Sequence, residues 1–184
     1  DPDQALYAHI SYVQPHSPFH PPGAYMRCVD TARIPAPAPA EWVDDPHAPG
    51  YFSDKEPREM DWEYARHCYF ADIVHLDQQL GRVREALEAS APMANPTIIF
   101  TADHGDMLAE KNMVQKRSFY EMSSRVPMIV DLPGGEGAGA CCAEPVNLID
   151  LAPTFLEMAG VGEWLPMDGT SLLSCVSGAE AGRV

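Results

Sequence analysis

Hydrophobic positions change their spacing several times along this chain, and each spacing predicts a different kind of element. Residues 6–13, LYAHISYV, alternate in polarity and are rich in β-formers, so they predict a strand. Two later runs, 97–102 and 126–132, are short, apolar and β-branched, which is typical of strands buried on both faces of a sheet. Residues 145–150 predict a further short strand.

Helical spacing dominates residues 58–90. Apolar side chains recur there three and four residues apart and form one stripe, made of Tyr69, Ile73, Leu76, Leu80, Val83 and Leu87. A shorter helix is predicted over 150–160, with Asp150 as its N-cap, Pro153 in its first turn and Gly160 as its stop.

Strands that alternate with helices predict an α/β layered sandwich, in which helices flank a largely parallel central sheet. Residues 14–22 contain four prolines and residues 23–57 are also Pro-rich, so we expect a long irregular loop there. Such a loop either borders a pocket or simply wraps the domain. Under the first alternative its aromatic side chains line the pocket: Phe19, Trp42, Tyr51 and Phe52.

The composition narrows the class of protein. A net charge of −15 repels phosphate backbones and anionic lipids, so we expect neither nucleic acid nor a membrane surface as partner. No apolar run is long enough for a transmembrane helix, and no secretory signal is visible at the N-terminus. The five cysteines form no CxxC pair, so we expect free, mostly buried thiols in a reducing compartment, which favours the cytoplasm.

The tripeptide 103-DHG-105 follows a predicted strand directly. Open α/β sheets bind ligands beyond the carboxyl ends of their strands, so Asp103 and His104 are candidate metal ligands. A carboxylate and an imidazole suit Mg²⁺, Mn²⁺ or Zn²⁺ better than Ca²⁺. The alternative is that Asp103 caps an ordinary turn and that His104 is its hydrogen-bonded neighbour.

Two further side chains are candidates for the chemistry itself. Lys116 follows a loop of mixed polarity and could bind an anionic substrate or protonate a leaving oxygen. His16 lies between two prolines just past a strand, which suits a positioned general acid. A solvated lysine and a turn histidine without a task are the alternatives.

Taken together, these residues resemble a known family. The block 101-TADHGDMLAEKNMVQKRSFYEMSSRVPMIV-130 resembles the sulfatases of the alkaline phosphatase superfamily, and it looks closest to the branch of choline sulfatases and phosphonate monoester hydrolases. Four more pieces agree in order: 9-HISYVQPHSPF-19, 67-HCYFADIVHLDQQLGRVREAL-87, 147-NLIDLAPTFLEMAGV-161 and 168-DGTSLL-173.

The resemblance implies a role for each candidate. Asp103 and His104 would be two ligands of one divalent metal ion, with Ca²⁺ expected first and Mg²⁺ or Mn²⁺ as alternatives. His104 stands where many sulfatases carry Asn, which favours the phosphonate and choline-sulfate side. His16 and Lys116 would be catalytic and substrate-binding residues that contact the transferring group. Arg125 matches a family arginine, for which we expect a structural role beside a carboxylate.

Other family features have no match in the chain. The family nucleophile is a formylglycine made in Cys/Ser-x-Pro-x-Arg, and none of the five cysteines has that context. The family's N-terminal pair of metal-binding aspartates also has no match. The predicted helix over 58–90 carries Asp72 and Asp77, but both look like helix-face residues. We therefore expect residues 1–184 to be a partial sulfatase-like catalytic domain with an incomplete alkaline phosphatase-like fold. It would lack the N-terminal nucleophile segment, have an incomplete C-terminal subdomain, and have little or no activity alone.

Several functions stay open after this comparison. The leading one is a metal-dependent hydrolase of sulfate monoesters, which would act on a small-molecule ester. The same scaffold also suits a phosphonate monoester or phosphodiester hydrolase, or a phosphotransferase with a Thr or Ser nucleophile. A non-catalytic or degenerate binding relative is the alternative from another class. The oligomeric state, including a homo-oligomer, stays open.

Overall fold

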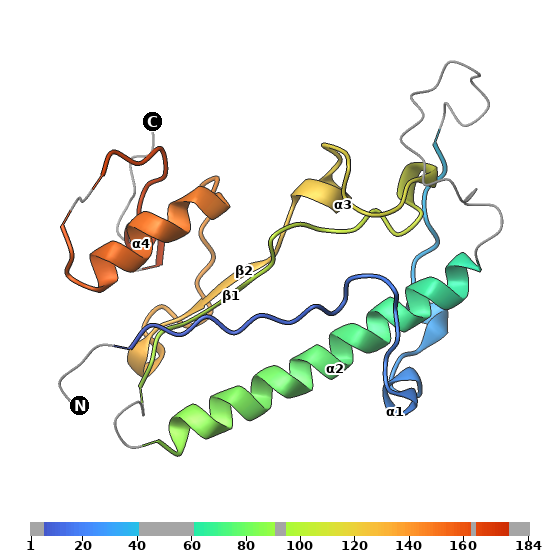
Figure 1. Ribbon diagram of the computed structural model, residues 1–184, viewed down its shortest axis with the longest axis horizontal. Helices are drawn as coiled ribbons and strands as arrows, with labels where there is room; N and C mark the ends of the chain where they lie inside the picture. The colour runs from blue at the N-terminus through green and yellow to red at the C-terminus, as the bar shows by residue number, and fades with distance from the viewer. Residues whose placement is uncertain (1–5, 41–60, 91–94, 163–164, 177–184) are drawn as a thin grey trace. The chain divides into compact units, whose positions relative to one another are not determined.

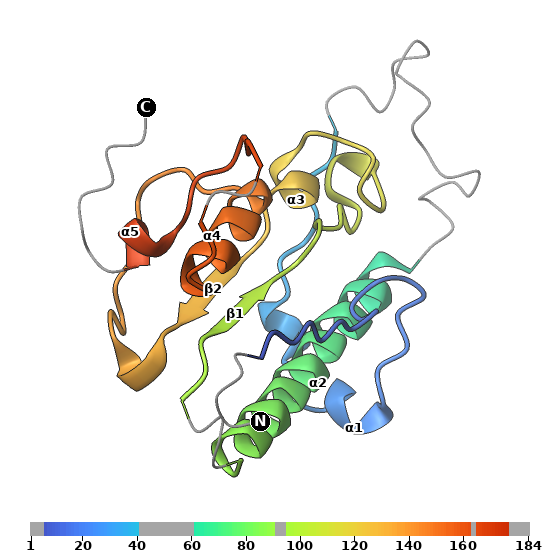
Figure 2. The same ribbon diagram turned by 60° about the vertical axis from the view of Figure 1, so that its left-hand side comes forward.

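The computed structural model describes residues 6–40, 61–90, 95–162 and 165–176. They fall into two compact units (Figures 1 and 2). The first, here the sheet unit, comprises the described residues within Asp1–Ala8, Ser90–Asp103 and Met128–Val184. The second, here the α2 unit, comprises the described residues within His9–Ala89 and His104–Pro127. The predicted Pro-rich loop lies partly outside the described residues, together with Trp42, Tyr51 and Phe52.

The α2 unit is built on one long helix, α2 (Trp62–Glu88), which confirms the helix predicted over 58–90. Its first turn is capped by Asp61, whose carboxylate accepts a hydrogen bond of 2.9 Å from the amide of Tyr64. The short helix α1 (Gly23–Met26) packs beside it, as both views show, within a stretch predicted to be irregular. Phe19 also packs on α2, with its ring edge-on to Tyr69 at 5.7 Å, so it anchors the N-terminal loop to the helix.

The sheet unit contains a two-stranded sheet of β1 (Ile98–Thr101) and β2 (Met128–Asp131). Both strands were predicted, but their pairing is antiparallel, with Ile98 opposite Asp131, so a largely parallel sheet is wrong for the described strands. Residues 102–127 supply no long crossover helix between them: apart from one 3₁₀ turn, their only helix is α3 (Glu121–Ser124), and the chain runs back along β1. The strands are also less buried than predicted, since the side chain of Ile129 is 60% exposed.

Two predicted strands are absent from the described residues. No strand pairs with residues 6–13, and Leu6, Ile10 and Val13 there are exposed. Alternation of side chains does not make a strand without a neighbour for its backbone hydrogen bonds. Residues 145–150 end instead in a short 3₁₀ helix, because Asn147 and Asp150 form a reciprocal capping box that tightens the chain.

The C-terminal part of the sheet unit folds around Asp150 and Thr154. Helix α4 (Leu151–Met158) confirms the predicted helix, and Gly160, at φ +67°, ends it in a Schellman turn. Asp150 does not cap α4 with its side chain: its carboxylate accepts from the amides of Asn147 and Thr170, each at 2.8 Å. The hydroxyl of Thr154 accepts from the amide of Leu172 at 2.8 Å, just before α5 (Leu173–Val176). This ties the 168–173 segment to α4.

The cysteines are free, as expected, but they are not mostly buried. Cys68 is buried in α2 and Cys175 is partly buried, whereas the other three are exposed: Cys28, Cys141 and Cys142. Cys141 and Cys142 lie in the segment after β2, where residues 133–147 are all exposed. Within the described ranges, no helix is both long and apolar enough to span a bilayer.

Candidate functional site

Three of the four candidate residues come together in the α2 unit. The amine Nζ of Lys116 lies 3.0 Å from Nε2 of His16, although the two residues are 100 positions apart. The ring of His104 lies near that of His16, with 6.3 Å between their centroids. All three side chains are polar and at least partly exposed, so a small anion can reach them. The contact brings together two residues that were chosen separately from the sequence.

Backbone contacts fix how His16 presents its ring. Its Nδ1 lies 2.6 Å from the carbonyl oxygen of Ser17. A carbonyl oxygen only accepts hydrogen bonds, so Nδ1 must donate its N–H. In the neutral ring Nε2 then carries the lone pair, which accepts an N–H from Lys116. His104 is oriented in the same way, because its Nδ1 lies 2.8 Å from the carbonyl oxygen of Gly105, so Nε2 is the atom that a metal ion would meet.

The described residues offer only a partial donor set for a divalent cation. Asp103 is an exposed residue at the end of the sheet unit, and His104 follows it as the first residue of the next segment of the α2 unit. Within the described ranges, no three His, Cys, Asp or Glu side chains are grouped so that they could hold a metal ion. A carboxylate and an imidazole alone do not complete the shell of Ca²⁺ or Mg²⁺, which take about six or more ligands. The assignment of Asp103 and His104 as two metal ligands therefore stays a prediction.

Gly105 fixes the turn after the metal-ligand candidates. Its amide donates a hydrogen bond of 2.8 Å to the carbonyl oxygen of Ser123. A Cβ at this position would lie 2.1 Å from the carbonyl oxygen of Met122, so only glycine allows the two backbones to approach this closely. The sequence had marked this glycine only as part of the tripeptide, because the approach of the 122–123 backbone leaves no local signal.

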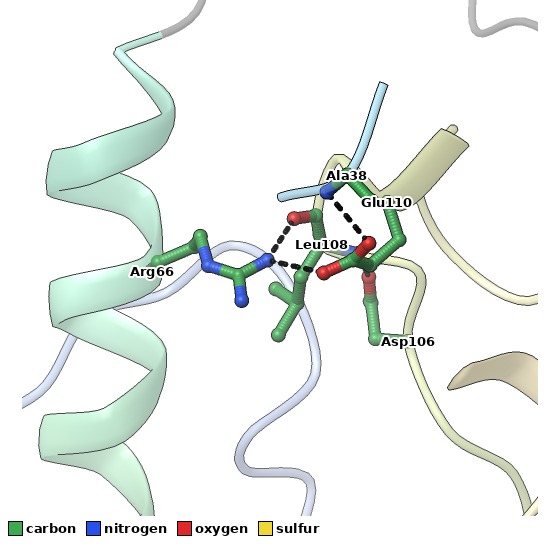
Figure 3. Close-up of polar contacts among 5 residues, drawn as sticks. All are labelled: Ala38, Arg66, Asp106, Leu108 and Glu110. Atoms are coloured by element: carbon green, nitrogen blue, oxygen red, sulfur yellow. Dashed lines mark hydrogen bonds and ion pairs between the residues drawn. The ribbon is translucent and has the colours of Figure 1, made fainter. Parts of the chain in front are cut away.

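A folded loop, residues 106–116, connects this turn to Lys116. Asp106 starts it, and one oxygen of its carboxylate accepts from the amides of Leu108 (2.9 Å) and Gln115 (3.2 Å). Arg66 of α2 donates to the carbonyl oxygen of Leu108 at 2.8 Å and forms an ion pair of 3.5 Å with Glu110 (Figure 3). These residues were missed in the sequence, because Arg66 and Leu108 are 42 positions apart and their contact leaves no local signal.

Two other charged residues differ in their surroundings. Arg125 pairs with Glu121 at 3.6 Å, and both side chains are mostly exposed, so the expected carboxylate partner is present.

Asp72 had looked like a helix-face residue, but it is 1% exposed and neither carboxylate oxygen has a hydrogen-bond partner among the described residues. Burial raises the pKa of the Asp72 carboxyl, and the nearby imidazoles of His75 and His20 offset this in part.

Tyr69 of α2 has a phenol with a perturbed pKa. Burial raises the pKa of its phenol, and the negative charge of Asp106 raises it further. The packing of the loop against the helix is carried by Arg66, which contacts Leu108 and Glu110.

Comparisons with known proteins identify the family of the chain. The profile of the sulfatase family matches residues 1–161. The arylsulfatase of Clostridium perfringens is 30% identical over 187 residues, which cover 94% of this chain and 37% of that protein. The choline-sulfatase of Rhizobium meliloti is 36% identical over 119 residues, covering 63% of this chain and 23% of that protein.

A solved structure resembles the whole chain. The phosphonate monoester hydrolase from Silicibacter pomeroyi superposes with a TM-score of 0.82 at 28% identity, over 100% of this chain and 39% of that protein. The expected α/β fold is thus confirmed in part, since the described residues hold only a two-stranded sheet with helices. The chain spans well under half the length of the relatives that it matches. With a family match over most of its residues, the chain belongs to the sulfatase family.

Proposed function

We propose that the protein hydrolyses sulfate monoesters of small molecules and that this chain supplies residues on the leaving-group side of the active site. One observation carries the proposal: Lys116 and His16 meet at 3.0 Å with His104 beside them. Membership of the sulfatase family supports the reaction class. In the proposal the nucleophile is a formylglycine, and Asp103 and His104 are two ligands of a divalent cation, with Ca²⁺ expected first.

The geometry of the pair suits the charge that develops in ester cleavage. As the S–O bond breaks, negative charge grows on the leaving oxygen and on the oxygens of the transferring group. In the proposal, the bound ester draws the Lys116 ammonium from Nε2 of His16 to the oxygens of the transferring group, where it stabilises that charge. His16, whose Nδ1–H is held by the carbonyl oxygen of Ser17, then carries a proton on Nε2 and gives it to the leaving oxygen.

A second candidate is hydrolysis of phosphonate monoesters or phosphodiesters on the same scaffold. The superposition on a phosphonate monoester hydrolase over the full chain favours it. The transferring phosphoryl group carries its charge on equatorial oxygens as a sulfuryl group does, so Lys116 and His16 would serve both reactions. For either reaction we propose a cytoplasmic protein that binds neither nucleic acid nor membranes.

The test begins with the coding sequence upstream of Asp1. An Asp-Asp pair followed by Cys/Ser-x-Pro-x-Arg is expected. A Thr in place of the Cys or Ser would move phosphoester chemistry ahead of sulfate hydrolysis. A start codon just before Asp1 would leave a binding protein or a degenerate relative as the better interpretation.

Kinetics of the complete gene product test the residues. With an aryl sulfate and an aryl phosphonate as alternative substrates, we expect Lys116→Met to lower kcat/KM by about 100-fold or more, the usual cost of removing one such donor. Arg117→Gln is the matched control, because it removes the exposed cation of the next residue. Equal activity of the Lys116 variant and the natural protein would reject Lys116 as a catalytic residue.

A further inference from the structure

The loop that carries Lys116 has an unusual backbone. Five of its residues other than glycine have positive φ angles between 43° and 71°: Leu108, Ala109, Lys111, Asn112 and Gln115. The left-handed region is unfavourable for residues with a Cβ, so local sequence does not select this conformation. The loop is nevertheless packed, because Met107 is fully buried and Met113 is 6% exposed. Contacts from outside the loop must hold it.

Hydrogen bonds join the two arms of the loop to each other. The amide of Met107 donates to the carbonyl of Gln115 at 2.8 Å, and that of Ala109 donates to Met113 at 2.9 Å. Asp106 bridges the same arms through the amides of Leu108 and Gln115. A displacement at Leu108 is therefore transmitted to Gln115, whose neighbour is Lys116.

Arg66 is a side chain of α2 that reaches this loop. It is 6% exposed, and its Nη1 donates to the carbonyl oxygen of Leu108, at the first of the left-handed residues. The same nitrogen pairs with Glu110, whose other oxygen accepts from the amide of Ala38 at 2.8 Å (Figure 3). One arginine and one carboxylate thus join three segments of the α2 unit: the helix, the loop and residues 38–40.

We propose that Arg66 is a positioning residue for Lys116. It holds the loop in the conformation that brings Nζ of Lys116 to Nε2 of His16, and it does so without touching the substrate. The guanidinium is suited to this task because it remains charged when buried and bonds a carbonyl and a carboxylate from one rigid plane. The catalytic consequence rests on the function proposed above, whereas the geometric part concerns only the α2 unit.

The test uses a signal that does not require turnover. The ¹⁵N chemical shift of His16 Nε2 reports its hydrogen bond to Lys116, and Lys116→Met gives the value for the broken contact. We expect Arg66→Met to move the His16 shift most of the way to that value and Arg66→Lys to move it less. Glu110→Gln, which keeps the shape of the side chain but removes its charge, should move it in the same direction by a smaller amount.

Arg84→Met is the matched control. Arg84 lies on the same helix and pairs with Glu88 at 3.0 Å, but both side chains are mostly exposed. We expect no change in the His16 shift, since an exposed pair does not hold a packed loop. The exposed His9 serves as an internal reference in every variant.

In the complete gene product, Arg66→Met should lower kcat by about 10- to 100-fold, the usual effect of a displacement of about 1 Å at the chemistry. An unchanged His16 shift in folded Arg66→Met overturns the proposal. If that variant does not fold, unchanged shifts in both Arg66→Lys and Glu110→Gln overturn it. A shifted His16 in a product without esterase activity would instead reject the proposed function and leave the positioning role standing.

Discussion

Replacing Gly105 by alanine adds one methyl group at the point where two backbone segments of the α2 unit meet. The new Cβ would lie 2.1 Å from the carbonyl oxygen of Met122 and 3.0 Å from its carbonyl carbon. An ordinary contact begins at 3.4 Å, so the 122–123 segment would have to retreat by roughly 1.3 Å. The obstacle is backbone, which cannot turn aside as a side chain can.

The cost follows from two effects. Forcing an extra methyl group into a packed site costs about 1–3 kcal/mol. The retreat also stretches the 2.8 Å hydrogen bond from the Gly105 amide to Ser123, whose loss costs about 1 kcal/mol. Together they predict a loss of about 2–4 kcal/mol in the free energy of unfolding. For a chain of 184 residues this lowers Tm by about 5–15 °C.

Urea and thermal unfolding followed by circular dichroism measure this loss. Gly81→Ala is the matched control: Gly81 lies inside α2, and a Cβ there would meet no atom within 4 Å. That control should stabilise the protein by about 0.5–1 kcal/mol, since alanine favours helix. The steric reasoning would be refuted by a Gly105→Ala variant as stable as the natural protein.

Three further predictions concern buried groups. Burial raises the pKa of Asp72 in the folded state above its ordinary range, so its ionisation destabilises the fold as the pH rises through the folded pKa. Asp72→Asn should therefore unfold at higher urea than the natural protein at pH 7, with an advantage that fades towards pH 4. Equal urea midpoints at pH 7 would contradict this. Thr154→Val should cost about 1–3 kcal/mol in denaturant unfolding, because it leaves the buried amide of Leu172 without its acceptor; a loss below about 0.5 kcal/mol would count against that bond. In native protein a thiol reagent should leave Cys68 unmodified until urea is added and should react quickly with the exposed thiols: Cys28, Cys141 and Cys142.

The elements with a strong local signal were predictable. The stripe in 58–90 predicted α2, and the apolar β-branched runs predicted β1 and β2, because these patterns depend on near neighbours. The pairing direction was not predictable, since it depends on the path of residues 102–127. The strand predicted over residues 6–13 is absent for a similar reason. Their pattern fits a strand, but a strand also requires a neighbouring strand for its backbone hydrogen bonds.

The residues of the candidate site also divide into those that the local sequence predicted and those that it missed. Residue type and spacing were enough to propose His16, His104 and Lys116, and the structure brings these three together. The chemistry assigned to them remains a prediction. Arg66 and Gly105 were missed, because their importance comes from segments far away in sequence, namely the 106–116 loop and the 122–123 backbone.

The contacts of the 106–116 loop also determine when the site can form during folding. Arg66 meets Leu108 across 42 positions, Ala38 meets Glu110 across 72, and His16 meets Lys116 across 100. Closing such long loops costs chain entropy before any contact offsets it, whereas a helix such as α2 nucleates locally within microseconds. The helix is therefore expected to form early and the His16–Lys116 pair late. On the ribosome, a nascent chain can already contain folded α2 while the His16–Lys116 pair forms only after residue 116 has emerged.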